Sequence, residues 1–395
     1  MQEAPGPGRR RGPRPLLLHL ALAGMSSSSL SGGLPSLNED WTRWLQQFHS
    51  LHPSGDGAAR PEPPPIDQRL IAGIAAYRRH PYRRDLADPP ACWTEGGSRL
   101  LDYGGEGPPI VLVPSLINRA YVLDLSADRS MARTLAASGL RVLLLDWGWP
   151  GPEERRLDLD ALITGRLTRA IAAVGKKVIL AGYCMGGLLT LAAALRAPER
   201  VACLALLATP WDFQAADTGI GPASARLIET MEPVLALSGT LPIDALQMLF
   251  SVGDPHGVGA KYRAFASQDQ SGDRARHFVA LEDWLNDGVP LAAPIARDCL
   301  LGWYGENRPM HGDWVVGGAP VDPSRLAMPC FIAIPGRDRI VPPESAEALA
   351  RLIPRAEIHR PAAGHVGMVA GATAASALWW PLRDWALKNF SPPHE

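Results

Sequence analysis

Three residues with the chemistry of a covalent catalyst lie in separate glycine-containing segments of the chain. Cys184 lies in VILAGYCMGG, between a short apolar run and a helical pattern. Asp338 and His365 follow later apolar runs, in GRDRIVPP and GHVG. A thiol attacks acyl groups as its thiolate, and a histidine oriented by a carboxylate can take up the thiol proton. The types and order of these residues therefore predict a Cys-His-Asp nucleophilic triad.

The residues around Cys184 predict how its thiol is presented. The run 178–181 is apolar and β-favouring, and the residues after Gly187 have helical spacing, so Cys184 is expected at a strand-to-helix corner. Gly182 and Gly186 stand two residues away on either side, where a Cβ would collide with the strand or the helix. This is the spacing of the nucleophile elbow of α/β-hydrolases, with cysteine where serine is usual. The positive end of the following helix favours a thiolate.

Asp338 and His365 have the positions expected for the acid and the base of such an elbow. The acid precedes the base, each follows a predicted strand, and their separation leaves room for one helix and one strand. His365 lies between Gly364 and Gly367, and histidine can move protons because its ordinary pKa lies near neutrality. Asp338 would orient the imidazole. The simpler alternatives are that Cys184 is a buried, inert thiol and that Asp338 only caps a turn.

A tetrahedral intermediate on Cys184 would need two backbone N–H donors for its oxyanion. The first is predicted to be that of Met185, directly after the nucleophile. The second is expected from the loop PSLIN, which follows the predicted strand 110–113. Within this loop we favour Leu116, with Ser115 and Ile117 as alternatives.

Apolar segments alternate with amphipathic helical patterns over most of the chain. The predicted strands are 98–103, 110–113, 142–145, 178–181, 203–208, 330–334 and 356–359. The predicted helices are 66–80, 125–138, 157–174, 187–197, 345–352 and 373–388. This alternation predicts an α/β-hydrolase fold, with a mostly parallel sheet covered by helices on both faces.

The domain organisation follows from where this alternation begins and where it breaks. We expect a flexible Pro/Ser/Gly-rich leader at 1–65, a core formed by 66–210 and 328–395, and a helical cap insertion at 211–327. The insertion contains four tryptophans, expected either to pack it against the core or to line an acyl channel: Trp211, Trp284, Trp303 and Trp314.

Composition excludes several classes of function. The chain has 395 residues and a net charge of -1, so nothing favours nucleic acid as a partner. Its five cysteines are widely spaced without a matching histidine cluster, which argues against a disulfide framework and a metal site and favours a reducing compartment. No cofactor is predicted. No run approaches the ~20 apolar residues of a membrane span.

The N-terminus has some features of a signal peptide. Residues 8–23 combine a basic start, an apolar run and an Ala-x-Ala site, but His19 interrupts the run and Pro13 and Pro15 precede it. We therefore predict an uncleaved leader, or a start at Met25, in preference to export. The expected location is cytoplasmic.

Beyond these residues, the segment from about Leu101 to Ala370 resembles the polyhydroxyalkanoate synthases, which polymerise 3-hydroxyacyl-CoA. The resemblance runs in order through IVLVPSLINRAYVLDL, LLLDWGWPGPEERRLDLDALI, AGYCMGG, TPWDF, EDWLNDGVPLA, GRDRIVPPESA and GHVG. It implies that Cys184 carries the acyl group, that His365 is the base and that Asp338 is its partner. Arg339 and Pro343 stand where the family usually has histidine and tryptophan.

The resemblance also implies a substrate and partners. These are acyl-CoA, a polyester chain, a second copy of the chain or an accessory synthase subunit, and a polymer granule. A cysteine suits this chemistry because an acyl group moves from one thioester to another at little cost in free energy. Two alternatives stay open: a Cys-dependent hydrolase of the same fold, such as a thioesterase or polyester depolymerase, and a non-catalytic granule-associated protein with a relict triad.

Overall fold

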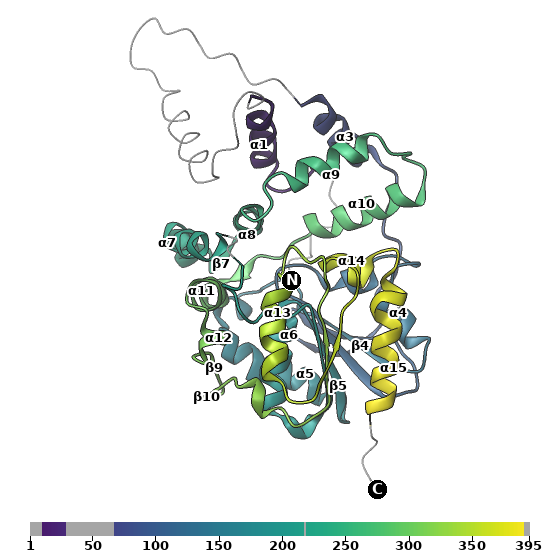
Figure 1. Cartoon of the computed structure of the whole chain (residues 1–395), viewed down its shortest axis with the longest axis vertical. Helices are drawn as coiled ribbons and strands as arrows, with labels where there is room; N and C mark the ends of the chain where they lie inside the picture. The colour runs from purple at the N-terminus through teal and green to yellow at the C-terminus, as the bar shows by residue number, and fades with distance from the viewer. Residues whose placement is uncertain (1–9, 29–66, 217–218, 391–395) are drawn as a thin grey trace, which may run out of the picture. The chain divides into compact units, whose positions relative to one another are not determined.

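The computed structural model describes residues 10–28, 67–216 and 219–390 (Figure 1). These residues form two compact units. Over its described residues, the core unit comprises Tyr82–Gly253 and Val279–Glu395, and the helical unit comprises Pro7–Pro81 and Asp254–Phe278. The leader, core and cap boundaries predicted from the sequence, at 65, 210 and 327, remain predictions.

An eight-stranded sheet forms the centre of the core unit. Its strand order is β1-β2-β4-β3-β5-β6-β11-β12, with β1–β2 and β2–β4 antiparallel and every other neighbouring pair parallel. The strands are β1 (Ala91–Glu95), β2 (Ser98–Asp102), β3 (Pro109–Val113), β4 (Arg141–Asp146), β5 (Val178–Tyr183), β6 (Val201–Leu207), β11 (Cys330–Ala333) and β12 (Ala356–His359). The predicted mostly parallel sheet is confirmed.

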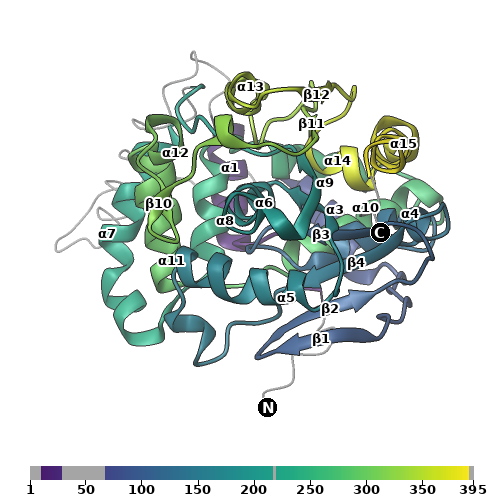
Figure 2. The ribbon, with the colours of Figure 1, turned by 90° about the horizontal axis from the view of Figure 1, so that it is seen from below.

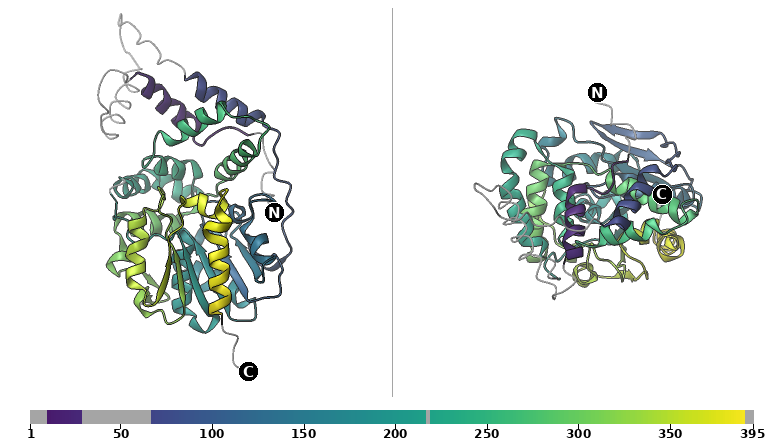
Figure 3. Two further views of the ribbon diagram at one scale, coloured as in Figure 1. Left: turned by 45° about the vertical axis from the view of Figure 1, so that its right-hand side comes forward. Right: turned by 90° about the horizontal axis from the view of Figure 1, so that it is seen from above.

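Helices cover both faces of this sheet. Alternate strand residues point to opposite sides, and the residues on both sides are apolar, so each face is buried against helices. In β3, Val111 and Val113 belong to one buried apolar cluster, whereas Ile110 and Leu112 belong to another. Figure 2 shows helices on either side of the strands. The first cluster contains residues of η3 (Ala161–Leu167), α5 (Thr168–Ala172), α6 (Met185–Arg196) and α13 (Pro343–Leu352). The second contains residues of α4 (Met131–Ala136), α14 (His365–Ala370) and α15 (Trp380–Asn389), the yellow helix that lies beside the sheet in the left view of Figure 3.

The chain between β6 and β11 is mainly helical. Its part in the core unit contains α7 (Ile220–Ser238), α8 (Ile243–Ser251), α11 (Ala293–Arg297), the π-helix η5 (Asp298–Gly305) and α12 (Arg308–His311). It also contains two short antiparallel ladders, β7–β8 (Thr240–Leu241, Leu291–Ala292) and β9–β10 (Val315–Val316, Ala319–Pro320). The helix α10 (Asp273–Asn286) begins in the helical unit and ends in the core unit.

The helical unit contains α1 (Leu16–Ser28), α3 (Gln68–Arg79) and α9 (Gly257–Ala266). The helix predicted at 66–80 is confirmed as α3, and the Asp67 side chain caps its N-terminus by accepting from the Leu70 amide at 2.9 Å. A Cβ at Gly73 would overlap the backbone of Tyr262, so glycine lets α3 approach α9 closely. Residues 16–28 fall within the predicted leader and form α1, whereas 29–66 lie outside the described residues. None of the helices in the described ranges is long and apolar enough to span a membrane.

Candidate active site

Cys184 lies at the corner between β5 and α6, as the sequence predicted. Its backbone has φ 57 and ψ -126, a conformation that L-residues rarely adopt and that costs of order 1–3 kcal/mol. Two hydrogen bonds hold the corner: the Cys184 amide donates to the Leu207 carbonyl at 2.8 Å, and the Gly187 amide donates to the Cys184 carbonyl at 2.9 Å. The strained corner therefore holds the side chain at the N-terminal end of α6, at the carboxyl edge of the sheet.

The glycines beside Cys184 are required by backbone packing. A Cβ on Gly182 would lie 2.5 Å from the Gly186 carbonyl oxygen, and a Cβ on Gly186 would overlap the carbonyl oxygen of Val113 in the neighbouring strand. Backbone atoms cannot move aside as the end of a flexible side chain can. The strand-turn-helix geometry thus depends on glycine at both positions.

Gly186→Ala is expected to lower the free energy of unfolding by about 2 kcal/mol or more, because the new methyl group overlaps backbone on β3. Gly367→Ala is the matched control. A Cβ at Gly367 would meet nothing within 4 Å, and alanine in a helix is favoured over glycine, so this variant should keep or gain stability. Thermal or urea unfolding of both variants checks the prediction, and equal stability of the two would contradict it.

Asp338 and His365 form a buried pair beside this corner. Nδ1 of His365 lies 2.7 Å from Oδ2 of Asp338, and their side chains are 6% and 0% exposed. The other carboxylate oxygen, Oδ1, accepts from the backbone amides of Ile340 at 2.8 Å and Val341 at 2.9 Å. Asp338 therefore both caps its turn and holds the imidazole. Because an ionised carboxylate only accepts, Nδ1 carries a proton and Nε2 is left for the thiol.

The charges at the site favour a protonated histidine. Burial disfavours the imidazolium of His365, but the charge of the Cys184 thiolate and hydrogen bonds to Asp338 and Cys184 outweigh it and raise the pKa of His365 to about 10. Burial, then the charges of Cys184 and Asp338, raise the pKa of the neighbouring Tyr183 phenol. The arrangement thus favours an imidazolium at His365 at neutral pH.

Removal of the thiolate should lower the pKa of His365, because burial then opposes the charged form with less compensation. In the wild type, a pKa raised from 6.5 to about 10 gives a stabilising contribution that is complete below 6.5 and is lost as the pH rises through about 10. NMR titration of the imidazole nitrogens in wild type and Cys184→Ala checks this, with His365→Gln used to assign the signal. An unchanged His365 titration in Cys184→Ala would count against the pairing.

The two predicted oxyanion donors belong to different segments. Met185 directly follows Cys184, and Leu116 lies in the loop after β3, the strand that pairs with β5. Met185 is the first residue of α6, and the Ser115 hydroxyl contacts its sulfur at 3.8 Å, which joins α6 to the loop after β3. The Ile117 amide donates to the Ser115 hydroxyl at 3.4 Å. In the described part of the chain the amides of Met185 and Leu116 donate to no protein acceptor. This favours Leu116 over Ile117, and the donor roles stay a prediction.

The loop that contains Leu116 is also fixed from its other side by the insertion. The Val289 amide donates to the Ile117 carbonyl at 2.7 Å, and Asn118 forms an antiparallel bridge with Gly288. In addition, the Trp284 indole N–H donates to the Arg119 carbonyl at 2.7 Å. This bridge and the Trp284 hydrogen bond thus join the loop to the segment 284–289.

Comparison with known proteins gives the family. Residues 108–372 match the family model described as alpha/beta hydrolase fold. A poly(3-hydroxyalkanoate) polymerase subunit PhaC from Synechocystis is 30% identical over 295 residues, which cover 70% of this chain and 77% of that protein. The chain belongs to the poly(3-hydroxyalkanoate) polymerase family. This confirms the resemblance and the fold class drawn from the sequence motifs.

Other polymerase subunits differ in how much of their length the chain spans. The match to the PhaC subunit of Haloferax mediterranei is 30% identical over 308 residues and covers 74% of this chain but only 62% of that protein. The match to the PhaC subunit of Allochromatium vinosum is 28% identical and covers 70% of this chain and 80% of that protein. A solved, malate-bound esterase from Thermogutta terrifontis aligns with a TM-score of 0.49 at 17% identity, covering 78% of this chain and all of that one.

The tryptophans of this polymerase-family chain pack as interior groups. Trp211, Trp303 and Trp314 are 1%, 2% and 6% exposed, and the Trp314 ring centroid lies 6.4 Å from that of Trp211 and 5.3 Å from that of Trp303. Trp284 is also buried, at 5%. These exposures favour the packing interpretation of the four tryptophans over a channel lining.

Tyr304 packs against the same buried apolar cluster as Cys184, and the sequence interpretation did not single it out. It lies in η5, and its ring packs edge-on against Phe213 with centroids 4.8 Å apart. Burial, followed by the charges of Cys184 and Cys299, raises the pKa of its phenol. Nothing in the sequence GWYGEN indicated this contact, because it arises from the packing of the insertion. Arg339, one of the two departures from the family motif, is exposed beside the buried Asp338.

Proposed function

We propose that the chain transfers 3-hydroxyacyl groups from CoA to a hydroxyl acceptor through a thioester on Cys184. The observation that supports this most directly is the strained corner that sets Cys184 beside the buried Asp338–His365 pair. Membership of the polymerase family supports the acyl-CoA substrate and a polyester chain as acceptor. The chain covers only 62% of the Haloferax subunit. The polymerase activity named for that whole subunit is therefore assigned to this chain only as part of the proposal.

In the first half-reaction, the Cys184 thiolate attacks the thioester carbonyl of the acyl-CoA. The amides of Met185 and Leu116 would stabilise the oxyanion. The bond from the acyl carbon to the CoA sulfur then breaks, and the CoA sulfur leaves as a thiol with the proton of the His365 imidazolium. This leaves an acyl-thioester on Cys184 and a neutral imidazole.

In the second half-reaction, the imidazole of His365 takes the proton of the acceptor hydroxyl while its oxygen attacks the acyl carbon. The bond to the Cys184 sulfur breaks, which restores the thiolate–imidazolium pair and releases an oxoester. Water in place of the hydroxyl would release a free acid instead. Exclusion of water from the acyl-enzyme therefore decides between polymer growth and hydrolysis.

Incubation of the purified chain with 3-hydroxybutyryl-CoA tests the proposal. CoA release is followed with a thiol reagent, and the product is separated into insoluble polymer and soluble 3-hydroxybutyrate. The reaction is run with and without host lysate, which would supply an accessory subunit. Polymer supports the acyltransferase; soluble acid alone would replace it by the Cys-dependent hydrolase, and no CoA release in either reaction would favour the non-catalytic alternative.

The remaining parts of the proposal concern assembly and location. We propose a second copy of the chain or an accessory synthase subunit as partner, and a cytoplasmic location at the surface of polymer granules. Sedimentation of the purified chain with and without lysate, and its recovery in a polymer-granule fraction, test these two points separately from the chemistry.

A further inference from the structure

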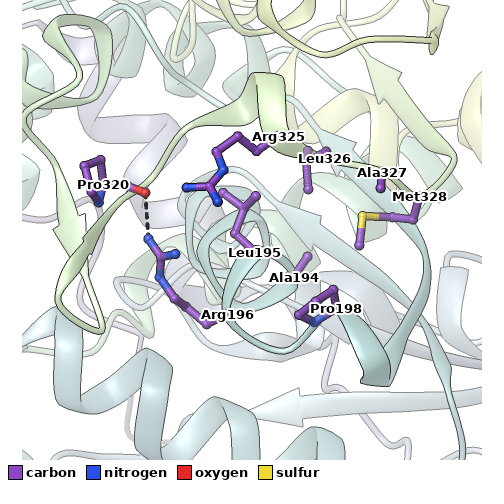
Figure 4. Close-up of a pocket in the computed structure, with 9 residues that line it drawn as sticks. All are labelled: Ala194, Leu195, Arg196, Pro198, Pro320, Arg325, Leu326, Ala327 and Met328. Carbon is purple, nitrogen blue, oxygen red and sulfur yellow. Dashed lines mark hydrogen bonds between the residues drawn. The ribbon is translucent and has the colours of Figure 1, made fainter.

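A cavity lined by two arginines and by apolar groups lies in the core unit, away from Cys184. It has a volume of about 240 Å³ and opens at the C-terminal end of α6 (Figure 4). Cys184 precedes the first residue of α6 and Arg196 is its last, so a 12-residue helix with a rise of about 1.5 Å per residue separates them by roughly 18 Å. The cavity and the proposed active site are therefore different places.

Two arginines face one another in this cavity without a carboxylate between them. Figure 4 shows the guanidinium groups of Arg196 and Arg325 pointing toward the same space. Nε of Arg196 donates to the Val316 carbonyl at 2.7 Å, and Nη2 donates to the carbonyls of Ala319 at 2.5 Å and Pro320 at 2.6 Å. In the described part of the chain neither guanidinium forms an ion pair, and Nη1 of the half-buried Arg196 and the head of the exposed Arg325 donate to no protein acceptor.

The electrostatics of Arg196 agree with this geometry. Burial and then the charge of Arg325 lower the pKa of Arg196, and the charge of Asp160 only partly offsets this lowering. The carboxylate of Asp160 accepts instead from the Gly317 amide in the β9–β10 turn. An anion between the two guanidiniums would relieve their repulsion, and the fixed guanidinium of Arg196 would meet it already oriented.

The rest of the cavity wall is apolar, and its size limits the ligand. The wall is formed by Ala194, Leu195, Pro198, Leu326, Ala327 and Met328. A volume of about 240 Å³ suits a small ligand. A bare phosphate would leave the apolar wall unused.

We propose that this cavity binds a small carboxylate with a short apolar chain, its head between Arg196 and Arg325 and its chain against the apolar wall. The two guanidiniums supply charge-assisted hydrogen bonds to the carboxylate oxygens. The apolar wall removes the chain from water. This site is independent of the proposed acyl transfer at Cys184.

The test is calorimetric titration of the full-length chain with hexanoate. Arg325→Ala is expected to weaken binding at least about ten-fold, because it removes a charge-assisted pair of donors. Its side chain contacts no protein acceptor, so the fold should persist. Arg226→Ala, which removes an exposed arginine of α7 elsewhere in the core unit, should leave the affinity unchanged. Cys184→Ala should also leave it unchanged, which separates this cavity from the proposed acyl site.

Ligand variants test the chemical class. Butyrate should bind more weakly than hexanoate, and acetate more weakly still. The affinity should fall by about four-fold for each methylene that no longer enters the cavity. Hexanol, with the chain but no charge, should bind at least about ten-fold more weakly. Equal hexanoate affinity in wild type and Arg325→Ala, no saturable binding at millimolar concentration, or inorganic phosphate binding as tightly as hexanoate would each overturn the proposal.

Discussion

Cys184→Ala is expected to reduce CoA release from 3-hydroxybutyryl-CoA by about 10⁴-fold or more, because the variant lacks the only atom that forms the proposed acyl-enzyme. Alanine keeps a Cβ and nothing beyond it, so the corner with its positive φ should fold as in the wild type. Mass spectrometry should show an added acyl group on wild-type protein quenched during turnover and none on the variant. The measurement is steady-state CoA release per mole of folded protein.

Cys92→Ala is the matched control for loss of a thiol. Cys92 is a free, exposed cysteine on the edge strand β1, and its sulfur donates only to the Leu100 carbonyl at 3.5 Å. Its removal should leave CoA release within about two-fold of wild type, as is usual for surface changes away from a site. If Cys184→Ala retained the wild-type rate, the assignment of the nucleophile would be wrong.

Asp338→Asn is expected to reduce kcat by about 10³- to 10⁴-fold with a small change in KM. The change is nearly isosteric. An amide oxygen can still accept from the backbone amides of Ile340 and Val341, so the turn should remain. The amide nitrogen, however, is a donor directed at Nδ1 of His365, and it favours the tautomer in which Nε2 carries the proton and cannot accept one from the thiol.

Asp322→Asn separates this effect from loss of a turn cap. Asp322 also caps a turn, accepting from the Ser324 amide at 3.0 Å and the Ser324 hydroxyl at 2.6 Å, but it holds no histidine. It should retain wild-type kcat. If both variants lost the same small amount of activity, Asp338 would act only as a turn residue, the simpler of the two interpretations that the sequence allowed.

The elbow was predictable because its determinants are local in the sequence. The glycines around Cys184, the apolar run before it and the helical pattern after it all lie within one short segment. The positions of Asp338 and His365 followed from the order of strands, since the carboxyl ends of parallel strands share one edge of the sheet. Their mutual contact at 2.7 Å needed the structure.

The elements that the sequence did not predict lack such local signals. β1 has no apolar run because it is an edge strand with largely exposed residues, and it pairs only with β2. The ladders β7–β8 and β9–β10 are two residues long and depend on packing within the insertion. α1 lay in a segment whose composition suggested irregular chain. The segment 157–174, predicted as one helix, contains the π-helix η3 before α5.

The contacts between the loop at Leu116 and the segment 284–289 have a consequence for the predicted oxyanion site. Because the Ile117 carbonyl accepts from the Val289 amide and Asn118 pairs with Gly288 in an antiparallel bridge, a displacement of that segment would move the backbone that presents the Leu116 amide. The two segments thus behave as a single mechanical element. The position of the predicted oxyanion donor Leu116 therefore depends on the insertion as well as on the strand β3 that precedes its loop.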